Sequence, residues 1–311
     1  MTPCIMFHHF TDNFHPKIQG AVSSNQFENI IQKLLPLGLV SATEWERLYL
    51  SGELKNEFCF TFDDNLKSQV DIALPIMLKY NLNAFFFVYT NPFLGKIERL
   101  ELYRFYRNIL FNSVDDFYSV FFNTMKSQDI WQELKHNYSD EKAESYYSQI
   151  DFYTKNDRIF RYLRDEIKRK KNYFLIMDKM INDSDFMNHK IINHIFLNTD
   201  DLNKLIQTGN IIGLHSQYHP TNMAKLSKQE QYHEYKSNYD FIQSKCPYSI
   251  ISMSHPSNSY NSDTIDILTS LEIKYGFRSV NDLSSFSTFE LPRIDYLLIE
   301  KEFKISISNF V

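Results

Sequence analysis

Around residue 60 the chain reads Phe60-Thr61-Phe62-Asp63-Asp64, an apolar run that ends abruptly in two adjacent carboxylates. Such a run is typical of a buried strand, and in α/β barrels the functional side chains lie at the C-terminal ends of the strands. Two neighbouring carboxylates repel each other unless a cation intervenes or one of them is protonated. A metal ion held by one carboxylate, with the other left free as a base, would resolve that repulsion. The alternative is a solvated Asp-Asp pair that caps the following helix.

Other short apolar runs alternate with helical patterns along the chain. Strands are expected at residues 3–7, 57–62, 83–88, 210–214, 248–253 and 274–278. Because strands that alternate with helices usually form a parallel sheet joined by crossover helices, the sequence predicts an α/β fold. At 311 residues the chain is long enough for one large α/β domain or two ordinary ones.

The segment from residue 96 to residue 196 differs from the rest. It has almost no Gly or Pro, reads as continuous helix and is dense in aromatic residues. We interpret it as a helical insertion, with residues 1–95 and 197–311 forming the two parts of one barrel. The insertion could cover the site, extend a substrate groove or make a homo-oligomer.

A second motif follows another apolar run, where the chain reads Gly-Leu-His-Ser-Gln-Tyr-His-Pro from Gly213 to Pro220. Two histidines four residues apart, His215 and His219, could face one cation from a single helical turn. Ser216 could hydrogen-bond the backbone of this loop. Pairs of histidines at this spacing also arise by chance, so this motif alone does not establish a metal site.

Taken together, the two motifs predict a metal site. Asp64, His215 and His219 supply one carboxylate and two imidazoles, a set of three ligands that leaves positions open for water and substrate. A metal ion in such a site acidifies water and polarises a carbonyl oxygen. Since both motifs follow predicted strands, the same face of a barrel could present them, with Asp63 as the free base.

The composition narrows the classes of function. With 43% hydrophobic and 23% charged residues the chain can bury a sizeable core, and its formal charge of -5 argues against nonspecific nucleic-acid binding. No run approaches the roughly 18 apolar residues of a membrane span, and the N-terminus lacks the basic and apolar regions of a signal peptide. Three scattered cysteines are too few for a disulfide framework. We therefore expect a cytoplasmic protein without a membrane span.

The two motifs, Phe-Thr-Phe-Asp-Asp and His-Ser-x-x-His, resemble the signature pair of the polysaccharide deacetylase family, also known as NodB-homology proteins or family 4 carbohydrate esterases. The resemblance implies a distorted (β/α)7 barrel and one divalent metal ion, commonly zinc, with cobalt or nickel tolerated. The usual reaction of the family is hydrolysis of an N-acetyl amide on a hexosamine. By this resemblance Asp63 is the catalytic base, and Asp64, His215 and His219 are the metal ligands.

One element of the usual family pattern is missing from its place. The family's general acid is a His near the end of the domain, whereas this chain has no His after His255. The chain begins instead with a segment containing His8 and His9, similar to the start of the circularly permuted deacetylase subgroup, in which the first strand supplies the acid. His8 aligns best and His9 next. Alternatively, both are ordinary residues at the end of a strand.

The third family motif, Arg-Pro-Pro-Tyr-Gly or Tyr-Pro-Tyr-Gly, is only echoed in Ser254-His255-Pro256-Ser257-Asn258. Ser257 can still offer the backbone N–H that serves the family as an oxyanion donor, but the aromatic wall for the sugar is lost. Ser254 stands where the family has the Arg that steadies the base.

A replacement for that Arg could come from the segment 291–295, which resembles a C-terminal element of the permuted subgroup. Arg293 in this segment could supply the missing cation beside Asp63. The alternative is that Arg293 forms a plain surface ion pair.

The sequence therefore predicts a metal-dependent carbohydrate N-deacetylase that removes an N-acetyl group from an amino sugar of a surface-glycan precursor or polysaccharide. The substrate could be nucleotide-linked, lipid-linked or an oligosaccharide. One alternative is a catalytically inactive sugar-binding protein that keeps the barrel, which the degraded third motif favours. Another is a non-haem iron oxygenase, since two His and one carboxylate also suit such iron sites. In those enzymes the carboxylate usually follows the first His closely, unlike Asp64 here.

Overall fold

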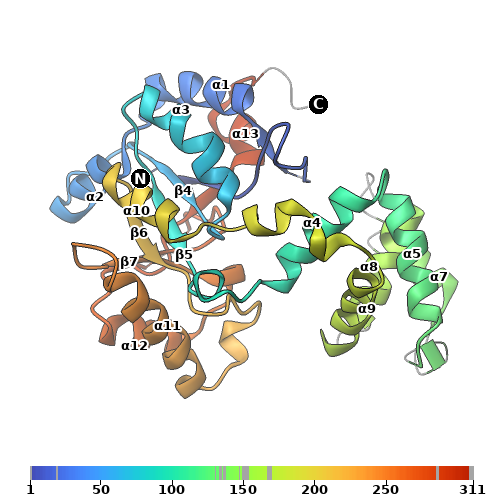
Figure 1. Ribbon diagram of the computed structural model, residues 1–311. Helices are drawn as coiled ribbons and strands as arrows, with labels where there is room; N and C mark the ends of the chain where they lie inside the picture. Colours follow the sequence, from blue (N-terminus) through green and yellow to red (C-terminus); the bar gives the residue numbers. More distant parts are fainter. Residues whose placement is uncertain are drawn as a thin grey trace. The chain divides into compact units, whose positions relative to one another are not determined.

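Seven strands form one parallel sheet, in the order β8-β7-β6-β5-β4-β1-β9 (Figure 1). The computed structural model describes residues 2–18, 20–129, 131–132, 135, 138–146, 148, 154–166, 170–284 and 287–307. The seven strands are β1 (Cys4–Phe7), β4 (Phe60–Phe62), β5 (Phe85–Val88), β6 (Ile211–Leu214), β7 (Ser252–Ser254), β8 (Tyr275–Phe277) and β9 (Arg293–Asp295). Two shorter strands, β2 (Phe10–Thr11) and β3 (Val22–Ser23), pair with each other.

The two edges of the seven-stranded sheet meet, so the sheet is a nearly closed barrel. At one edge β9 pairs in parallel with β1. At the other edge Phe277 of β8 forms a parallel bridge to Leu291, just before β9, and the backbone N–H of Arg278 donates to the Leu291 carbonyl at 3.0 Å. The predicted fold, an α/β barrel of the distorted (β/α)7 type, is therefore confirmed.

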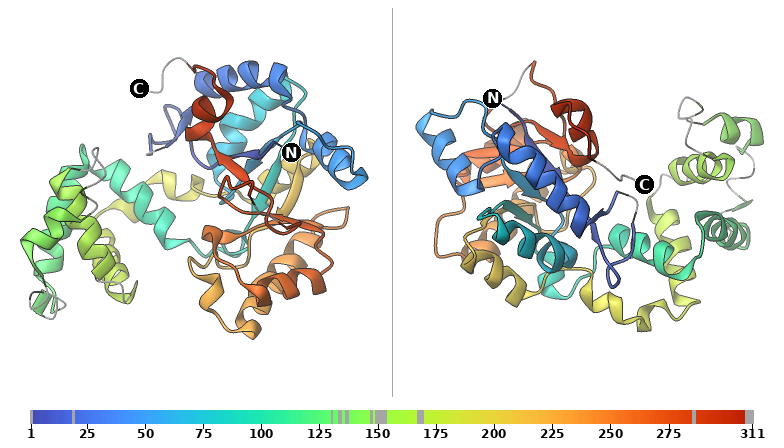
Figure 2. Two further views of the ribbon diagram at one scale, coloured as in Figure 1. Left: turned by 180° about the vertical axis from the view of Figure 1, so that it is seen from behind. Right: turned by 90° about the horizontal axis from the view of Figure 1, so that it is seen from above.

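Helices lie around the outside of this barrel (Figure 2). They are α1 (Ser24–Leu34), α2 (Ala42–Ser51), α3 (Leu74–Lys79), α10 (Thr199–Gln207), α11 (Lys228–Gln243), α12 (Ser262–Ser270) and α13 (Ile299–Phe303). A π-helical segment, Gln69–Ala73, lies between β4 and α3. Short 3-10 helices span Leu35–Leu37, Asn91–Leu94, Met223–Lys225, Pro256–Asn258 and Tyr296–Leu298. In the described part of the chain, no helix has both the length and the apolar character to cross a bilayer.

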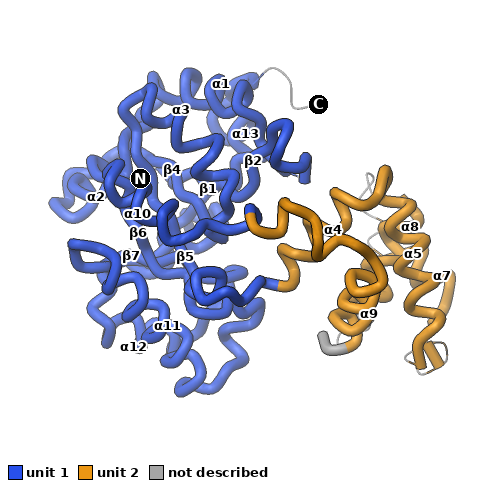
Figure 3. The backbone as a smooth tube through the Cα atoms, viewed as in Figure 1, with its two compact units in different colours: residues 1–98, 194–311 blue, residues 99–193 orange. Residues whose placement is uncertain are grey.

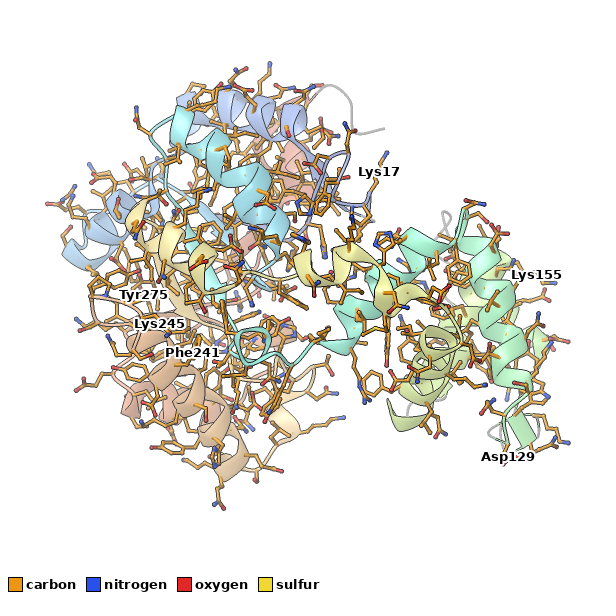
Figure 4. All side chains as sticks on the ribbon, in the orientation of Figure 1. Lys17, Asp129, Lys155, Phe241, Lys245 and Tyr275 are labelled. Carbon is orange, nitrogen blue, oxygen red and sulfur yellow. The ribbon has the colours of Figure 1, made fainter. Side chains whose placement is uncertain are left out.

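Side chains alternate along each strand between the barrel interior and the surrounding helices. The interior is filled largely by aromatic rings, among them Phe85 and Phe87 of β5 with Tyr275 and Phe277 of β8; Tyr275 is labelled in Figure 4. Trp45 of α2 joins this cluster, with its ring centroid 5.7 Å from that of Phe85. The intervening strand residues belong to a second cluster that packs against the helices. The same alternation determines which side chains at the C-terminal ends of the strands point into the mouth of the barrel.

The six predicted strands all correspond to strands of the sheet, but their bounds differ. The strand predicted at residues 248–253 begins later, at Ser252 of β7. Tyr248 lies outside the ladder, where its hydroxyl accepts the N–H of Ile212 at 3.1 Å and donates to the Asn210 carbonyl at 3.2 Å. This side chain therefore bonds the start of β6 in place of a backbone partner. The strand β9 and the β2–β3 pair were not predicted from the sequence.

Residues 99–193 form a second compact unit, whereas residues 1–98 and 194–311 form the first (Figure 3). The described helices of the second unit are α4 (Arg99–Leu110), α5 (Val114–Lys126), α7 (Asp140–Ser145), α8 (Lys155–Glu166), α9 (Lys170–Asn182) and a 3-10 helix at Phe186–Asn188. A further 3-10 helix, Lys190–His194, follows where this unit ends. The described part of this segment contains several separate helices; for example, the Ser113 hydroxyl accepts the N–H of Asp116 at 3.1 Å and so begins α5 after a break. That residues 96–196 are an insertion into the barrel stays a prediction.

Gly213 of β6 occupies a position where a side chain would not fit. It pairs with Phe87 of β5, and a Cβ here would lie 2.6 Å from the Phe87 ring and 2.9 Å from the Ser252 carbonyl oxygen. We expect Gly213→Ala to lower the free energy of unfolding by about 1–3 kcal/mol through overpacking, as measured by chemical denaturation. Adding Phe87→Leu should return part of this loss, because it removes ring atoms that the new Cβ meets. Unchanged stability of Gly213→Ala would contradict the close packing of this strand pair.

Candidate active site and metal centre

Polar side chains from several strands meet at one mouth of the barrel. Asp63 and Asp64 directly follow β4, and His215 follows β6. His8 follows β1, and Ser254 is the last residue of β7. Because the strands are parallel, their C-terminal ends lie on the same face of the barrel. The two sequence motifs and the N-terminal histidine are therefore presented together.

Asp64, His215 and His219 form a cluster with the donor set of a metal site. One donor atom from each residue lies within 4.8 Å of the other two. The Nε2 atoms of His215 and His219 lie 3.4 Å and 3.2 Å from the same oxygen, Oδ1 of Asp64. The three residues predicted as ligands are thus brought together by the fold. One carboxylate oxygen and two imidazole nitrogens suit zinc and similar divalent ions.

The two histidines lie in a loop, not on the helical turn that their spacing suggested. Ser216 has a φ of 67° and His219 a φ of 53°, so both have left-handed backbone conformation, which costs about 1–3 kcal/mol at a non-Gly residue. The Ser216 hydroxyl accepts the N–H of His219 at 3.1 Å. Glu234 accepts the N–H groups of Gln217 and Tyr218 at 3.0 and 2.8 Å. These bonds stabilise a loop that turns both imidazole rings towards one carboxylate.

The ring of His215 is oriented by the neighbouring strand. Its Nδ1 lies 2.9 Å from the Ser254 carbonyl oxygen, so Nδ1 carries the donated proton and Nε2 keeps its lone pair for a metal ion. The N–H of His215 donates to Asn238 at 2.9 Å. The Asn238 amide in turn donates to the Val88 carbonyl and the Thr90 hydroxyl, each at 2.9 Å. The residues present therefore fit a divalent ion.

The pKa shifts of two of the three residues, Asp64 and His219, also suit cation binding. Burial alone would raise the pKa of Asp64, but the charge of His219 and the hydrogen bond with His215 outweigh burial and hold this pKa well below its usual value. Burial lowers the pKa of His219 to about 4. These shifts favour a carboxylate at Asp64 and a neutral imidazole at His219, the forms in which these side chains bind metals. Burial alone would lower the pKa of His215, but the charge of Asp63 and the hydrogen bond with Asp64 raise it, so a bound metal ion would replace a proton on this ring.

Asp63 does not point into this cluster but forms a buried ion pair with Arg293. The two nitrogens Nη1 and Nη2 donate to Oδ1 and Oδ2 at 2.8 and 2.7 Å, a two-point contact that fixes the carboxylate. The other N–H groups donate to the hydroxyls of Thr61 and Ser254, at 3.2 and 2.7 Å, and to the Arg278 carbonyl at 3.0 Å. All five N–H groups of the guanidinium are thereby used.

This contact decides how Arg293 is to be interpreted. Its side chain is 0% exposed, so the alternative of a plain surface ion pair is wrong. Burial alone would raise the pKa of Asp63, but the charges of Arg293 and His215 outweigh burial and lower it. The Ser254 hydroxyl also donates to Oδ2, at 3.2 Å. The cation that the third motif lacks therefore comes from β9.

His8 lies at the exposed edge of the cluster. Its Nε2 is 4.0 Å from Oδ2 of Asp64, and 31% of its side chain is exposed. His9 is buried, with its ring centroid 6.4 Å from that of His8. Of the two N-terminal histidines, His8 is therefore the one that a substrate can reach beside the cluster.

Ser257 lies in the 3-10 turn Pro256–Asn258 that follows β7, with its side chain exposed and a φ of 51°. The preceding His255 anchors this turn: it is buried, its Nε2 lies 2.7 Å from the Phe289 carbonyl oxygen, and its ring stacks on Tyr260 at 4.0 Å between centroids. The role of the Ser257 N–H as an oxyanion donor stays a prediction.

Three buried residues that position the site were not predicted from the sequence: Gln69, Glu234 and Asn238. Each bonds main-chain groups of the motif loops. In the sequence each stands in a segment with a helical pattern, where a buried amide or carboxylate looks like a solvent-facing residue. No pattern distinguishes them.

Part of the chain is similar in sequence to a known protein family. Residues 154–276 match the family model described as polysaccharide deacetylase. The chain contains a polysaccharide deacetylase domain. The matched segment includes His215 and His219, whereas Asp63 and Asp64 precede it. The family predicted from the motifs is confirmed, and the circularly permuted subgroup stays a prediction. No curated protein matches the sequence significantly.

Solved structures similar to this chain share its fold at low sequence identity. A Streptococcus pyogenes deacetylase in complex with acetate is 17% identical with a TM-score of 0.56, covering 94% of this chain and 91% of that chain. A de-N-acetylase from Aggregatibacter actinomycetemcomitans is 12% identical with a TM-score of 0.53, covering 100% and 97%. A polysaccharide deacetylase from Bacillus cereus is 10% identical with a TM-score of 0.52, covering 94% and 64%. At these sequence identities the similarity shows that the three proteins and this chain share a fold.

The ion pair in the deacetylase barrel predicts a specific pattern of stability. Arg293→Met should cost about 3–5 kcal/mol in free energy of unfolding at neutral pH, because it leaves the buried Asp63 charge without a partner. The double variant Asp63→Asn with Arg293→Met should be more stable than Arg293→Met, since the uncompensated charge is gone. Equilibrium denaturation measures both.

A surface arginine provides the control for this cycle. Arg47 forms ion pairs with Glu44 and Glu53 but its side chain is 56% exposed, so Arg47→Met should change stability far less than Arg293→Met. If the double variant were no more stable than Arg293→Met alone, charge compensation would not be what Arg293 provides.

Proposed function

We propose that this deacetylase is a metal-dependent hydrolase that removes an N-acyl group, chiefly N-acetyl, from an amino sugar of a surface-glycan precursor or polysaccharide. The observation that carries the proposal is the position of Asp63, a carboxylate bound by Arg293 and separate from the cluster of Asp64, His215 and His219. A carboxylate that lies beside a metal site without being a ligand can act as the general base in hydrolysis of an amide. This arrangement supplies one.

Asp64, His215 and His219 would hold the ion. A divalent ion such as zinc, cobalt or nickel acidifies water and polarises a carbonyl oxygen when bound in such a site. The Ser254 carbonyl would keep the His215 ring in the tautomer that leaves Nε2 for the ligand bond, as their 2.9 Å contact indicates.

Asp63 would take the proton of the attacking water. Arg293 holds both carboxylate oxygens, at 2.8 and 2.7 Å, and so fixes the plane of the group. Oδ2 also accepts the Ser254 hydroxyl at 3.2 Å, whereas Oδ1 keeps a further lone pair that can accept a proton. The ion pair therefore orients the base and keeps it ionised without occupying it fully.

His8 would give a proton to the departing nitrogen, without which an amine is a poor leaving group. Its position supports this role, because it is partly exposed and borders Asp64 at 4.0 Å. The backbone N–H of Ser257 would bind the developing oxyanion, an interaction worth roughly 3–4 kcal/mol when well placed. Because His8 comes from the first strand, we assign the chain to the circularly permuted subgroup, with residues 96–196 as an insertion into the barrel.

The proposal makes separate predictions for the base and for a ligand. Asp63→Asn should retain the metal but lose turnover by a factor of about 10²–10⁴, the usual contribution of a general base. His215→Ala should lose the metal itself. Elemental analysis after dialysis measures metal content, and acetate release measures turnover on nucleotide-linked, lipid-linked and oligosaccharide N-acetylhexosamines. The acceptor that reacts also identifies the carrier.

His233 provides the matched control, because it is an exposed histidine of α11. His233→Ala should keep both metal and turnover. Normal deacetylation by both Asp63→Asn and His215→Ala would refute the proposed mechanism. Sugar binding by the metal-loaded protein without any acetate release would instead favour the inactive sugar-binding alternative.

A further inference from the structure

Gln69 links two strand ends at the mouth of the barrel. It is the first residue of the π-helical segment after β4, and its side chain is fully buried. Its Nε2 donates to the His8 carbonyl oxygen at 2.9 Å and to the Asp63 carbonyl oxygen at 2.6 Å. Because both partners are carbonyl acceptors, the side chain must present its NH2 group here and uses both of its N–H bonds.

The residue before it contributes a further contact to the same segment. The Ser68 hydroxyl accepts the N–H of Phe10 at 3.3 Å. The turn that leads into the π-helical segment therefore holds the main chain after β1 at His8 and again at Phe10. π-helical turns are rare and frequently lie at functional sites. Here the turn places Gln69 between the ends of β1 and β4.

The two strand ends depend on Gln69 to different degrees. The Asp63 carboxylate has its own anchors, because Arg293 holds both oxygens at 2.8 and 2.7 Å and the Ser254 hydroxyl donates at 3.2 Å. Among the described residues the His8 ring has no such anchor: its Nε2 lies 4.0 Å from Oδ2 of Asp64, and 31% of the side chain is exposed. Loss of the Gln69 amide should therefore affect the position of His8 more than that of Asp63.

We infer that Gln69 is a positioning residue whose amide clamps the His8 main chain to that of Asp63 and so keeps the His8 imidazole beside the metal cluster. Gln69 touches neither the cluster nor a reacting atom, and it acts through His8. The inference rests on the proposed function, in which His8 protonates the leaving nitrogen.

A dependence on the leaving group follows. An amine needs a proton to leave, whereas 4-nitrophenolate leaves an acetate ester as a stable anion. Hydrolysis of either substrate would use Asp63 and the metal cluster, but only the amide would need the proton of His8. A defect in the position of His8 should therefore slow amide hydrolysis selectively, whereas general damage to the site should slow both reactions.

The test compares variants of the full, metal-loaded chain on an N-acetylhexosamine amide and on 4-nitrophenyl acetate. Gln69→Leu should lower kcat on the amide by about tenfold or more beyond any loss on the ester, with unchanged metal content, and His8→Ala should do the same. Gln231→Leu is the matched control, because Gln231 is also a fully buried glutamine and donates to the Leu226 carbonyl at 3.0 Å, but in α11. It should show no selective loss on the amide.

A readout that needs no turnover accompanies the kinetics. In NMR spectra the ring signals of His8 should shift or broaden in Gln69→Leu but not in Gln231→Leu. If Gln69→Leu does not fold, Gln69→Glu is measured in the same way. This variant keeps the size of the side chain but has a carboxylate oxygen in place of the NH2 group that donates. Equal loss on both substrates, no loss on the amide, or unchanged His8 signals would overturn the inference. A wild-type protein inactive on every amide would refute the proposed function instead, and the His8 signals alone would then decide the role of Gln69.

Discussion

The ion pair between Arg293 and Asp63 joins the closure of the barrel to the geometry of its mouth. Arg293 belongs to β9, the last strand, and its guanidinium reaches across the interior to the ends of β4 and β7, where it bonds Asp63 and Ser254. The rings of Phe87 and Phe277 flank it, with their centroids 5.7 and 6.0 Å from its central carbon. A buried charge of this kind is tolerated only when its partners are complete. Here every N–H is used, so the same contact that ties the barrel together also sets the carboxylate.

Two adjacent carboxylates avoid mutual repulsion by facing different partners. Asp63 faces Arg293, while Asp64 faces His215 and His219. The backbone makes this division possible, since Asp64 has a φ of 72° and turns the chain sharply after β4. The guanidinium of Arg293 thereby keeps Asp63 ionised, whereas Asp64 stays available to bind a metal ion. This separation of base and ligand is what the proposed hydrolysis uses.

The parts of this account that the sequence could predict are those carried by a strand and the residue that follows it. Asp64 and His215 each follow an apolar run, so their meeting at one end of a parallel barrel could be expected. The ion pair of Arg293 could only be suggested by resemblance, because it depends on β9 lying next to β1 and on the edges of the sheet meeting. The spacing of His215 and His219 suggests a helical turn, whereas the two residues lie in a loop, because spacing alone cannot reveal a left-handed backbone in a loop stabilised by Glu234. Nor does a polar helix show which of its amides is buried.

The central claim is that one cation binds between Asp64, His215 and His219 while Asp63 stays unligated beside it. Anomalous diffraction from crystals soaked in zinc tests this most directly. One peak is expected within bonding distance of a carboxylate oxygen of Asp64 and of Nε2 of both histidines, with the Asp63–Arg293 pair intact. A peak that takes Asp63 as a ligand, or no peak between these three side chains, would contradict the central claim.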